Sequence, residues 1–291
     1  MKKIKTKINN ILIMTLVFFS FITILSYVGV NIFITSPEKS FKKLDNLSIA
    51  YIKKGSGSPL LLVHDLNSSS ADFNSVIGEL SKRYTVIAID LPGFGESTKP
   101  ENLDYSINNL SYTCNKFMNS LGYKQYSVIG HGFGANISLE LATYDNVTSS
   151  LLLAPHQLTN TTTSIPSSIA DIIKNNYFYS LYKYKLNFFN SSNIDYNIFE
   201  ENLKVNNTTS TVILNKLYLD NKSYDPVKNV KKTKAKLLII YGTDNKSDVT
   251  TYNYNLFTLY PNSSFIKINN CKQNPHIEAK SIFLKEAFSF I

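Results

Sequence analysis

The sequence predicts an α/β protein built on one large, doubly wound and mostly parallel sheet. Short apolar runs alternate with helical stretches along the chain, which is the pattern of parallel strands joined by crossover helices. Several of the runs are continuously apolar, as expected for strands that are covered on both faces. The chain has 291 residues, enough for one such domain with a sizeable core and an appendage.

The charge of the chain lies mainly at its N-terminus. The net charge is +9, but residues 1–45 hold seven lysines against Glu38 and Asp45, which leaves about +4 for the rest. No stripe of Lys and Arg indicates a nucleic-acid surface. The two cysteines, Cys114 and Cys271, fit no metal-ligand or redox spacing. We therefore expect no nucleic-acid partner and no metal or other cofactor.

Residues 11–34 are predicted to span a membrane. This stretch of 24 residues carries no charge and follows the basic segment 1–10. Its length suffices to cross a hydrocarbon core of ~30 Å. A cleavable signal peptide would have an apolar region of only ~7–15 residues, and no small-residue cleavage site is evident before Ser36. We therefore favour an uncleaved signal anchor over a removed signal.

The position of the lysines predicts how the anchor is oriented. They precede the span, and few charges follow it directly, so the N-terminus is expected in the cytosol. The main domain, residues 47–291, is then extracytoplasmic and attached to the cell membrane by a single pass. Residues 35–46 form a juxtamembrane link that could add a first edge strand.

The sequence of the main domain predicts that strands and helices alternate up to about residue 154, and again after about residue 237. Ser68–Ser70 can cap a helix, and glycine-rich or polar turns bound most of the strands. The strands are expected at residues 47–53, 59–63, 85–89, 126–129, 151–154, 237–241 and 265–268, and the helices at about 68–83, 107–121, 136–143, 249–259 and 276–290.

Residues 157–224 interrupt this alternation. The segment is helical and aromatic instead of strand-forming, so it is predicted to be a lid inserted over the strand ends. Its rings are expected to pack the lid on the sheet more than to line a ligand groove.

The turn after the fourth strand carries the first motif with chemical meaning. Residues 128–135 are Val-Ile-Gly-His-Gly-Phe-Gly-Ala, an apolar strand that runs into a glycine-rich turn and a helix. This stretch resembles the nucleophile elbow of α/β-hydrolases, a G-x-S-x-G turn whose middle residue is a serine. Here the middle residue is Gly132. The turn keeps the architecture of the elbow and lacks its nucleophile.

Three further landmarks, in the family's order, carry the resemblance to α/β-hydrolases. His64-Asp65 matches the His-Gly pair that follows the third strand of the family's fold. Residues 90–97 resemble the family's D-x-x-G-x-G-x-S loop. Residues 275–278, Pro-His-Ile-Glu, resemble the segment just after the catalytic histidine. Together with the elbow they imply an α/β-hydrolase fold from about residue 47 to the C-terminus.

The resemblance places the family's catalytic triad on three unsuitable residues. The serine falls on Gly132, the acid on Asn245 and the histidine on Gln273. These residues offer no nucleophile, no charge to stabilise an imidazolium and no base near neutral pH. The resemblance also assigns the oxyanion hole to the backbone N–H groups of Phe133 and Leu66. The neighbouring Asp65 carboxylate is expected to oppose a developing oxyanion.

Other residues could replace the missing groups. Cys271 could act as a displaced nucleophile with His276 or His131, and Asp244 or Asp248 could replace the acid. A metal held by the histidines is the weaker interpretation, and free cysteines are more often small packed side chains. The residues predicted to lie at the pocket are His64, Asp65, His131, His156, Asp244, Cys271 and His276.

Two functions follow from these observations. The first is a membrane-anchored pseudoenzyme that binds an apolar small molecule under the lid or a protein partner through it. The second is an active hydrolase of the esterase or lipase kind that uses a non-standard nucleophile such as Cys271. An activity probe or a p-nitrophenyl ester distinguishes the two.

Overall fold

The computed structural model describes residues 38–157, 176–229, 232–260 and 263–291, with a few residues between 13 and 20. Pro37–Ile291 form one compact unit and Met1–Ser36 form another. Among the described residues, no helix has the length and apolar character needed to cross a membrane. The predicted span, residues 11–34, lies mostly outside the described residues.

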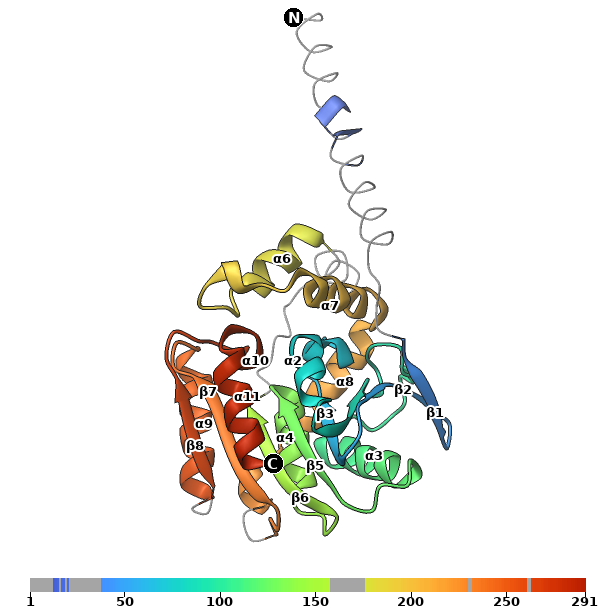
Figure 1. Cartoon of the computed structure of the whole chain (residues 1–291). Coiled ribbons are helices and arrows are strands. Elements are labelled where there is room, and N and C mark those ends of the chain that lie inside the picture. Colours follow the sequence, from blue (N-terminus) through green and yellow to red (C-terminus); the bar gives the residue numbers. More distant parts are fainter. Residues whose placement is uncertain are drawn as a thin grey trace, which may run out of the picture. The chain divides into compact units, whose positions relative to one another are not determined.

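An eight-stranded sheet forms the centre of the larger unit in its described part, in the order β1-β2-β4-β3-β5-β6-β7-β8 (Figure 1). β2 pairs antiparallel with β1 and with β4, and all other neighbouring strands are parallel. The predicted fold class, a mostly parallel sheet, is therefore confirmed. The strands are β1 (Ser40–Leu44), β2 (Leu47–Lys54), β3 (Ser58–Val63), β4 (Tyr84–Ile89), β5 (Tyr126–His131), β6 (Val147–Leu153), β7 (Lys236–Gly242) and β8 (Ser264–Ile268).

Helices cover both faces of the sheet, and this explains the continuously apolar strands. In β3, Leu61 packs in the same cluster as Phe117 of α3, whereas Leu60 packs in the same cluster as Phe283 of α11. Successive residues of a strand point to opposite faces, so a strand covered on both faces needs apolar residues throughout. The covering elements are η1 (Ser70–Phe73), α2 (Asn74–Leu80), α3 (Ile107–Ser120), α4 (Phe133–Leu141), α9 (Ser247–Leu259), α10 (Pro275–Glu278) and α11 (Lys280–Phe290).

Several elements differ from the prediction in their bounds, and two of these differences have a clear physical reason. β6 begins at Val147, four residues before the predicted start. Its two serines are buried because they are bonded internally, with Ser149 Oγ 2.7 Å from Ser127 Oγ and Ser150 Oγ donating to the carbonyl oxygen of Ser138. The last helix is broken at Ala279, whose φ of −127° and ψ of 42° separate α10 from α11.

A helical insertion separates β6 from β7. Its described helices are α6 (Tyr177–Lys185), η2 (Ser191–Asn193), α7 (Tyr196–Thr208) and α8 (Thr211–Asn221), followed by η3 (Pro226–Asn229). In Figure 1, α6 and α7 lie beyond the C-terminal ends of the parallel strands, whereas α8 lies deeper, beside α3 and α4. Residues 158–175, the first part of the predicted lid, lie outside the described residues.

Candidate functional site

The turn between β5 and α4 has an unusual backbone conformation at Gly132. This residue has φ 55° and ψ −113°, and it immediately precedes Phe133, the first residue of α4. A non-glycine residue held there would be strained by ~1–3 kcal/mol. Gly134 lets the helix approach the sheet, since a Cβ on it would lie 2.2 Å from the carbonyl oxygen of Val63. The chain thus keeps the geometry of an elbow without a side chain at its apex.

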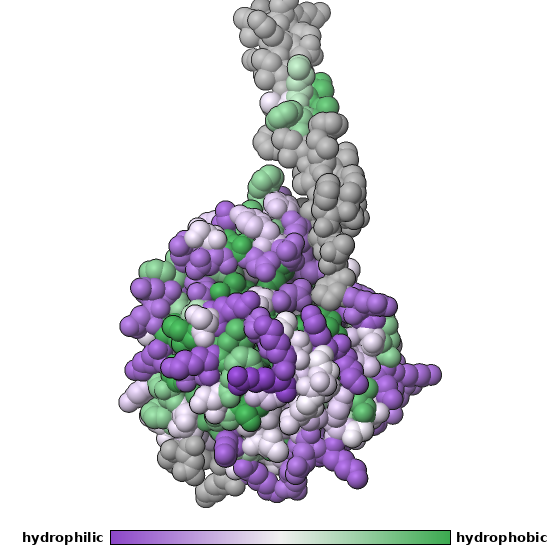
Figure 2. All heavy atoms as spheres, viewed as in Figure 1, coloured by the Kyte–Doolittle hydropathy of each residue, from purple (hydrophilic) through white to green (hydrophobic). Residues whose placement is uncertain are grey.

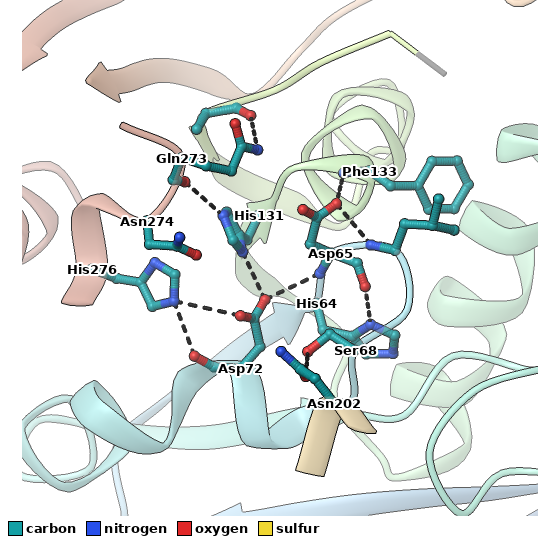
Figure 3. A network of polar contacts seen from close by, with 12 residues as sticks. His64, Asp65, Ser68, Asp72, His131, Phe133, Asn202, Gln273, Asn274 and His276 are labelled. Atoms are coloured by element: carbon teal, nitrogen blue, oxygen red, sulfur yellow. Dashed lines mark hydrogen bonds and ion pairs between the residues drawn. The ribbon is translucent and has the colours of Figure 1, made fainter. Parts of the chain in front are cut away.

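The carboxylate of Asp65 fills the space above Gly132. A Cβ atom built on Gly132 would lie 2.1 Å from both Cγ and Oδ1 of Asp65. Asp65 reaches this place from the loop that follows β3, as Figure 3 shows. A serine at position 132 and Asp65 in its present position therefore exclude each other.

The same carboxylate occupies the predicted oxyanion hole. Asp65 Oδ1 accepts hydrogen bonds from the backbone N–H groups of Leu66 and Phe133, each at 2.7 Å (Figure 3). The N–H of Phe133 is one of the N-terminal groups of α4 that lack a partner within the helix, and a negative charge is favoured at this end. Asp65 was expected to lie near the oxyanion hole and to oppose a developing oxyanion, and its carboxylate lies on the two predicted donors themselves. Asp65 Oδ2 has no partner among the described residues.

The structure brings together the other two predicted triad positions. Asn245 follows β7, Gln273 follows β8, and Asn245 Nδ2 donates to Gln273 Oε1 at 2.7 Å. The N–H of Lys246 donates to Asn245 Oδ1, which fixes the orientation of this amide. The two amides stand at the positions predicted for the acid and the base, and neither can exchange a proton near neutral pH.

Gln273 in turn fixes the tautomer of His156. Gln273 Nε2 donates to the carbonyl oxygen of Ala154 at 3.1 Å and lies 3.1 Å from His156 Nδ1. Because the amide nitrogen is only a donor, His156 Nδ1 must be the acceptor. The proton of the neutral ring therefore lies on Nε2, which is 3.8 Å from Asp65 Oδ1. His156 presents a hydrogen-bond donor to the site, not a free base.

A buried ion pair lies below the elbow. His131 Nδ1 is 2.7 Å from Asp72 Oδ2, and His131 Nε2 is 2.9 Å from the carbonyl oxygen of Gln273. Both ring nitrogens face acceptors, so both carry protons. Burial lowers the pKa of His131, but the Asp72 carboxylate outweighs this effect and raises the pKa to about 9. Asp72 was not predicted, and no pattern in the sequence distinguishes it from a solvated acid.

His276 belongs to the same buried cluster. Its Nε2 donates to the backbone carbonyl of Asp72 at 2.9 Å, and burial is the main cause that lowers its pKa. Ligand atoms of Asp72, His131 and His276 lie within 4.8 Å of one another, so these residues could hold a metal. However, Asp72 Oδ2 is already bonded to His131 Nδ1, and His131 is protonated on both nitrogens.

The remaining predicted pocket residues have structural contacts. His64 is buried, and its Nε2 accepts from the N–H of Leu91 while its Nδ1 donates to the carbonyl oxygen of Asp65. Cys271 is fully buried beside Glu278, and burial raises the pKa of its thiol, which argues against a nucleophile. Asp244 accepts from the N–H of Asn270 and does not line the pocket.

A cavity of about 250 Å³ opens beside this site. Two of the predicted pocket residues line it, Asp65 and His156, together with the triad positions Asn245 and Gln273. Most of the other lining side chains are also polar, and Val249 is the one apolar side chain among the described residues that line it. Asn187 and Lys246 also line the cavity, and no sequence pattern had indicated them. Asp248 and Gln157 complete the polar lining.

The chain is similar in sequence and in structure to proteins of the alpha/beta hydrolase fold. Residues 58–200 match the model of the alpha/beta hydrolase fold family. The chain is 36% identical to the soluble epoxide hydrolase of Corynebacterium sp. (strain C12) over 96 residues, which are 33% of each chain. It is 32% identical to haloalkane dehalogenase 2 of Mycobacterium tuberculosis (strain H37Rv) over 94 residues, 32% of this chain and 33% of the relative. The matches thus span about a third of these relatives.

Solved structures resemble the chain over a greater length. A membrane phospholipase A has a TM-score of 0.74 at 19% identity and covers 100% of this chain and 98% of its own. The enol-lactonase of Burkholderia xenovorans LB400 has a TM-score of 0.73 at 16% identity and covers 86% and 99%. At these identities the likeness concerns the fold alone.

Proposed function

We propose, from the premise that this chain belongs to the α/β-hydrolase fold family, that it is a membrane-anchored, extracytoplasmic protein that binds a ligand without hydrolysing it. The observation that carries this proposal is the position of the Asp65 carboxylate. It takes up both the space of the elbow side chain and the two N–H groups that would stabilise an oxyanion. A substrate carbonyl oxygen would have to displace a charged group from these donors.

The residues around Asp65 support the absence of hydrolysis. Hydrolysis by this fold needs a nucleophile, a base and a group that orients the base. The corresponding positions hold Gly132, Gln273 and Asn245, and the two amides are bonded to each other at 2.7 Å. The nearby histidine, His156, has its proton on the nitrogen that faces Asp65. Among the described residues that line the pocket, none is a Ser, Thr or Cys that could replace the missing nucleophile.

The pocket supports a polar ligand. Its lining offers the free Oδ2 of Asp65, the Nε2–H of His156, and the charged side chains of Lys246 and Asp248. Such a surface suits a small polar molecule better than the apolar one that the sequence suggested. Asn187 of the helical insertion also lines the pocket. We propose that the insertion acts as a lid and that a protein partner can contact the molecule through it.

The N-terminal segment supports the membrane attachment. Residues 11–34 carry no charge over 24 positions, and the lysines precede them. We propose a single pass with the N-terminus in the cytosol.

Restoring the triad in two backgrounds tests the role of Asp65. The full chain should not react with a fluorophosphonate probe and should not hydrolyse p-nitrophenyl acetate above buffer. The triple variant Gly132→Ser, Asn245→Asp, Gln273→His should remain inactive, because Asp65 still fills the oxyanion hole. Adding Asp65→Gly should bring weak esterase activity and labelling by the probe. Hydrolysis by the unmodified chain, or equal activity with and without Asp65→Gly, contradicts the proposal.

A second candidate function is a hydrolase with Asp65 as nucleophile. It is favoured by one observation: the two backbone donors hold Oδ1, whereas Oδ2 has no partner among the described residues. Oδ2 could attack a carbon that bears a leaving group, which departs with its bonding electrons and leaves an ester on Asp65. Water must then cleave the ester, and His156 Nε2 carries a proton and cannot activate it.

Mass spectrometry distinguishes this candidate from binding. The full chain is incubated with styrene oxide or 1,2-dibromoethane and digested. An adduct on the peptide that contains Asp65, absent in Asp65→Asn, would support the nucleophile. An unchanged peptide, together with saturable binding of a small molecule in the pocket, would support the binding protein.

A further inference from the structure

The first helix of the insertion exposes an unusual number of aromatic side chains. None of the nine side chains of α6 is buried, although five of them are aromatic. Phe178 is 62% exposed and Tyr182 is 60% exposed. We call the exposed residues Phe178, Tyr179, Tyr182, Leu186 and Phe189 the aromatic patch.

The aromatic patch is concentrated, unlike the other exposed apolar residues of the larger unit. These others are spread over several elements, with at most two on any one of them, for example Phe41 on β1, Tyr112 on α3 and Tyr254 on α9. Single exposed apolar residues are normal, whereas several together mark an interaction surface. Figure 2 shows apolar atoms at the surface over the insertion, among polar ones.

The segment that carries the aromatic patch has charges of one sign only, although the Glu278 carboxylate accepts a hydrogen bond from the N–H of Phe189. Residues 176–194 contain two lysines, Lys183 and Lys185, and no acidic residue. Both lysines lie in the last turn of α6. Aromatic rings accompanied by Lys are typical of helices that lie at the interface of a bilayer with anionic lipids.

Lys39, near the start of the larger unit, lies at the C-terminal ends of the parallel strands, where the insertion also lies. Lys39 Nζ is 2.8 Å from Asp90 Oδ2, and Asp90 directly follows the C-terminal end of β4. The insertion also lies at the C-terminal ends of the parallel strands, on the side of β8, because the N–H of Gln273, after β8, donates to the carbonyl oxygen of Asn187. Five residues lead from position 34 to Lys39 and span at most ~18 Å. If residues 11–34 cross a membrane, the point where the chain leaves it is therefore at most ~18 Å from Lys39.

We propose that the aromatic patch rests on the surface of an anionic bilayer, with Lys183 and Lys185 against the lipid head groups. This inference depends on the membrane anchoring proposed above. The contact holds the insertion and the pocket beside it against the membrane, so the ligand enters from the membrane–water interface.

Single tryptophans test this contact, because the chain contains none. Phe178→Trp and Tyr182→Trp place a reporter in the aromatic patch, and Tyr254→Trp on α9, 52% exposed, is the matched control. Each full-length variant is reconstituted into vesicles of phosphatidylcholine and phosphatidylglycerol, with and without brominated acyl chains. We expect the brominated lipid to quench the first two variants at least twofold and the control by less than a fifth.

The contribution of the two lysines to the membrane contact is tested in the same vesicles. Lys183→Glu with Lys185→Glu, in the Phe178→Trp background, should reduce the quenching by at least half, as should omission of phosphatidylglycerol. If the chain floats with the vesicles but Phe178→Trp is quenched no more than Tyr254→Trp, the docking is wrong and the anchor stands. If the chain does not float, the anchor and the docking both fail. An emission shifted to the blue without quenching would mean that a protein covers the aromatic patch, which also overturns the proposal.

Discussion

At the scale of single residues, Asp65 belongs to the candidate site and also accepts a hydrogen bond from the backbone at the start of α4. Gly132 precedes α4 and has no side chain to bond the first N–H groups of the helix. Asp65 supplies the missing acceptor from another loop, through Oδ1 and the N–H of Phe133. A carboxylate in this position typically stabilises a helix by ~1 kcal/mol. The residue that closes the oxyanion hole is therefore also one that the folded state needs.

Because Asp65 occupies the space where a side chain at position 132 would lie, we expect substitutions at the two positions to have strongly coupled effects on the free energy of unfolding. Gly132→Ala should lower the free energy of unfolding by ~1–3 kcal/mol through backbone strain. In addition, its Cβ displaces the Asp65 carboxylate from two charged hydrogen bonds, each worth ~1.5–3 kcal/mol. In the Asp65→Gly background only the strain remains. We expect the cost of Gly132→Ala, measured by urea unfolding, to be at least ~1.5 kcal/mol smaller there.

Gly122→Ala is the control for this double-mutant cycle. Gly122 also has a positive φ, 88°, but a Cβ on it would meet no atom within 4 Å. Its cost should be the same with Asp65 and with Asp65→Gly. Additive effects of Gly132→Ala and Asp65→Gly would show that the carboxylate does not occupy the apex.

The ion pair of His131 and Asp72 sets the pH dependence of stability on the alkaline side. The pKa of His131 is about 9 in the folded protein, because the Asp72 carboxylate outweighs burial, and ~6.5 in the unfolded chain. A group with a raised pKa stabilises the fold fully below its unfolded pKa, and this contribution is lost as the pH rises through its folded pKa. We expect the free energy of unfolding, measured in urea, to fall by ~2–3 kcal/mol between pH 6.5 and 9.

On the acid side the sign is reversed. Burial lowers the pKa of both His64 and His276, so their contribution is present above pH ~6.5 and is lost as the pH falls. Stability should therefore be greatest near pH ~6.5. The double variant His131→Gln, Asp72→Asn is the control, because it should lose the alkaline decline and keep the loss on the acid side. A decline of the same size in this variant would contradict the assignment to His131.

At the scale of elements, the sequence predicted where the strands lie along the chain, but not their order in the sheet. The strand positions followed from apolar runs and turn residues, which are local signals. Asn245 and Gln273 met because each follows a parallel strand, and such strands end at one edge of the sheet. The early start of β6 was missed because its serines are bonded internally. The position of the Asp65 side chain depends on contacts with a distant helix, which no local pattern encodes.

The insertion is tied into the core through α8. Asn221 at the end of α8 accepts from the N–H of Ile107 at 2.7 Å and donates to the carbonyl oxygen of Tyr105 at 2.8 Å. These bonds satisfy the backbone where α3 begins. Asn221→Ala should lower the free energy of unfolding by ~1–3 kcal/mol, because buried backbone groups lose their partners. Thermal or urea unfolding measures the change.

Asn255→Ala is the matched control, since Asn255 is exposed on α9. Its effect should stay within ~0.5 kcal/mol. If Asn221→Ala were equally mild, α8 would be a peripheral element and not part of the core that positions the site.

At the scale of the whole molecule, the larger unit should fold without the N-terminal segment. Met1–Ser36 form a compact unit of their own, and the core clusters lie within Pro37–Ile291. A chain that begins at Pro37 should therefore unfold in urea at the same midpoint as the full chain in detergent. The site, which also lies within this unit, should bind the same small molecules in both.

The first residues of the larger unit are nevertheless needed. Lys39 pairs with Asp90 at 2.8 Å, and the two side chains are only 4% and 0% exposed. A chain that begins at Ser40 leaves the buried Asp90 carboxylate with backbone donors and no cation. Because breaking a buried pair is costly, this chain should be less stable than the one from Pro37 by ~2–3 kcal/mol. Lys39→Met in the longer chain should have the same effect. Equal unfolding midpoints of the two shortened chains would mean that the pair contributes nothing and that the fold begins at β1.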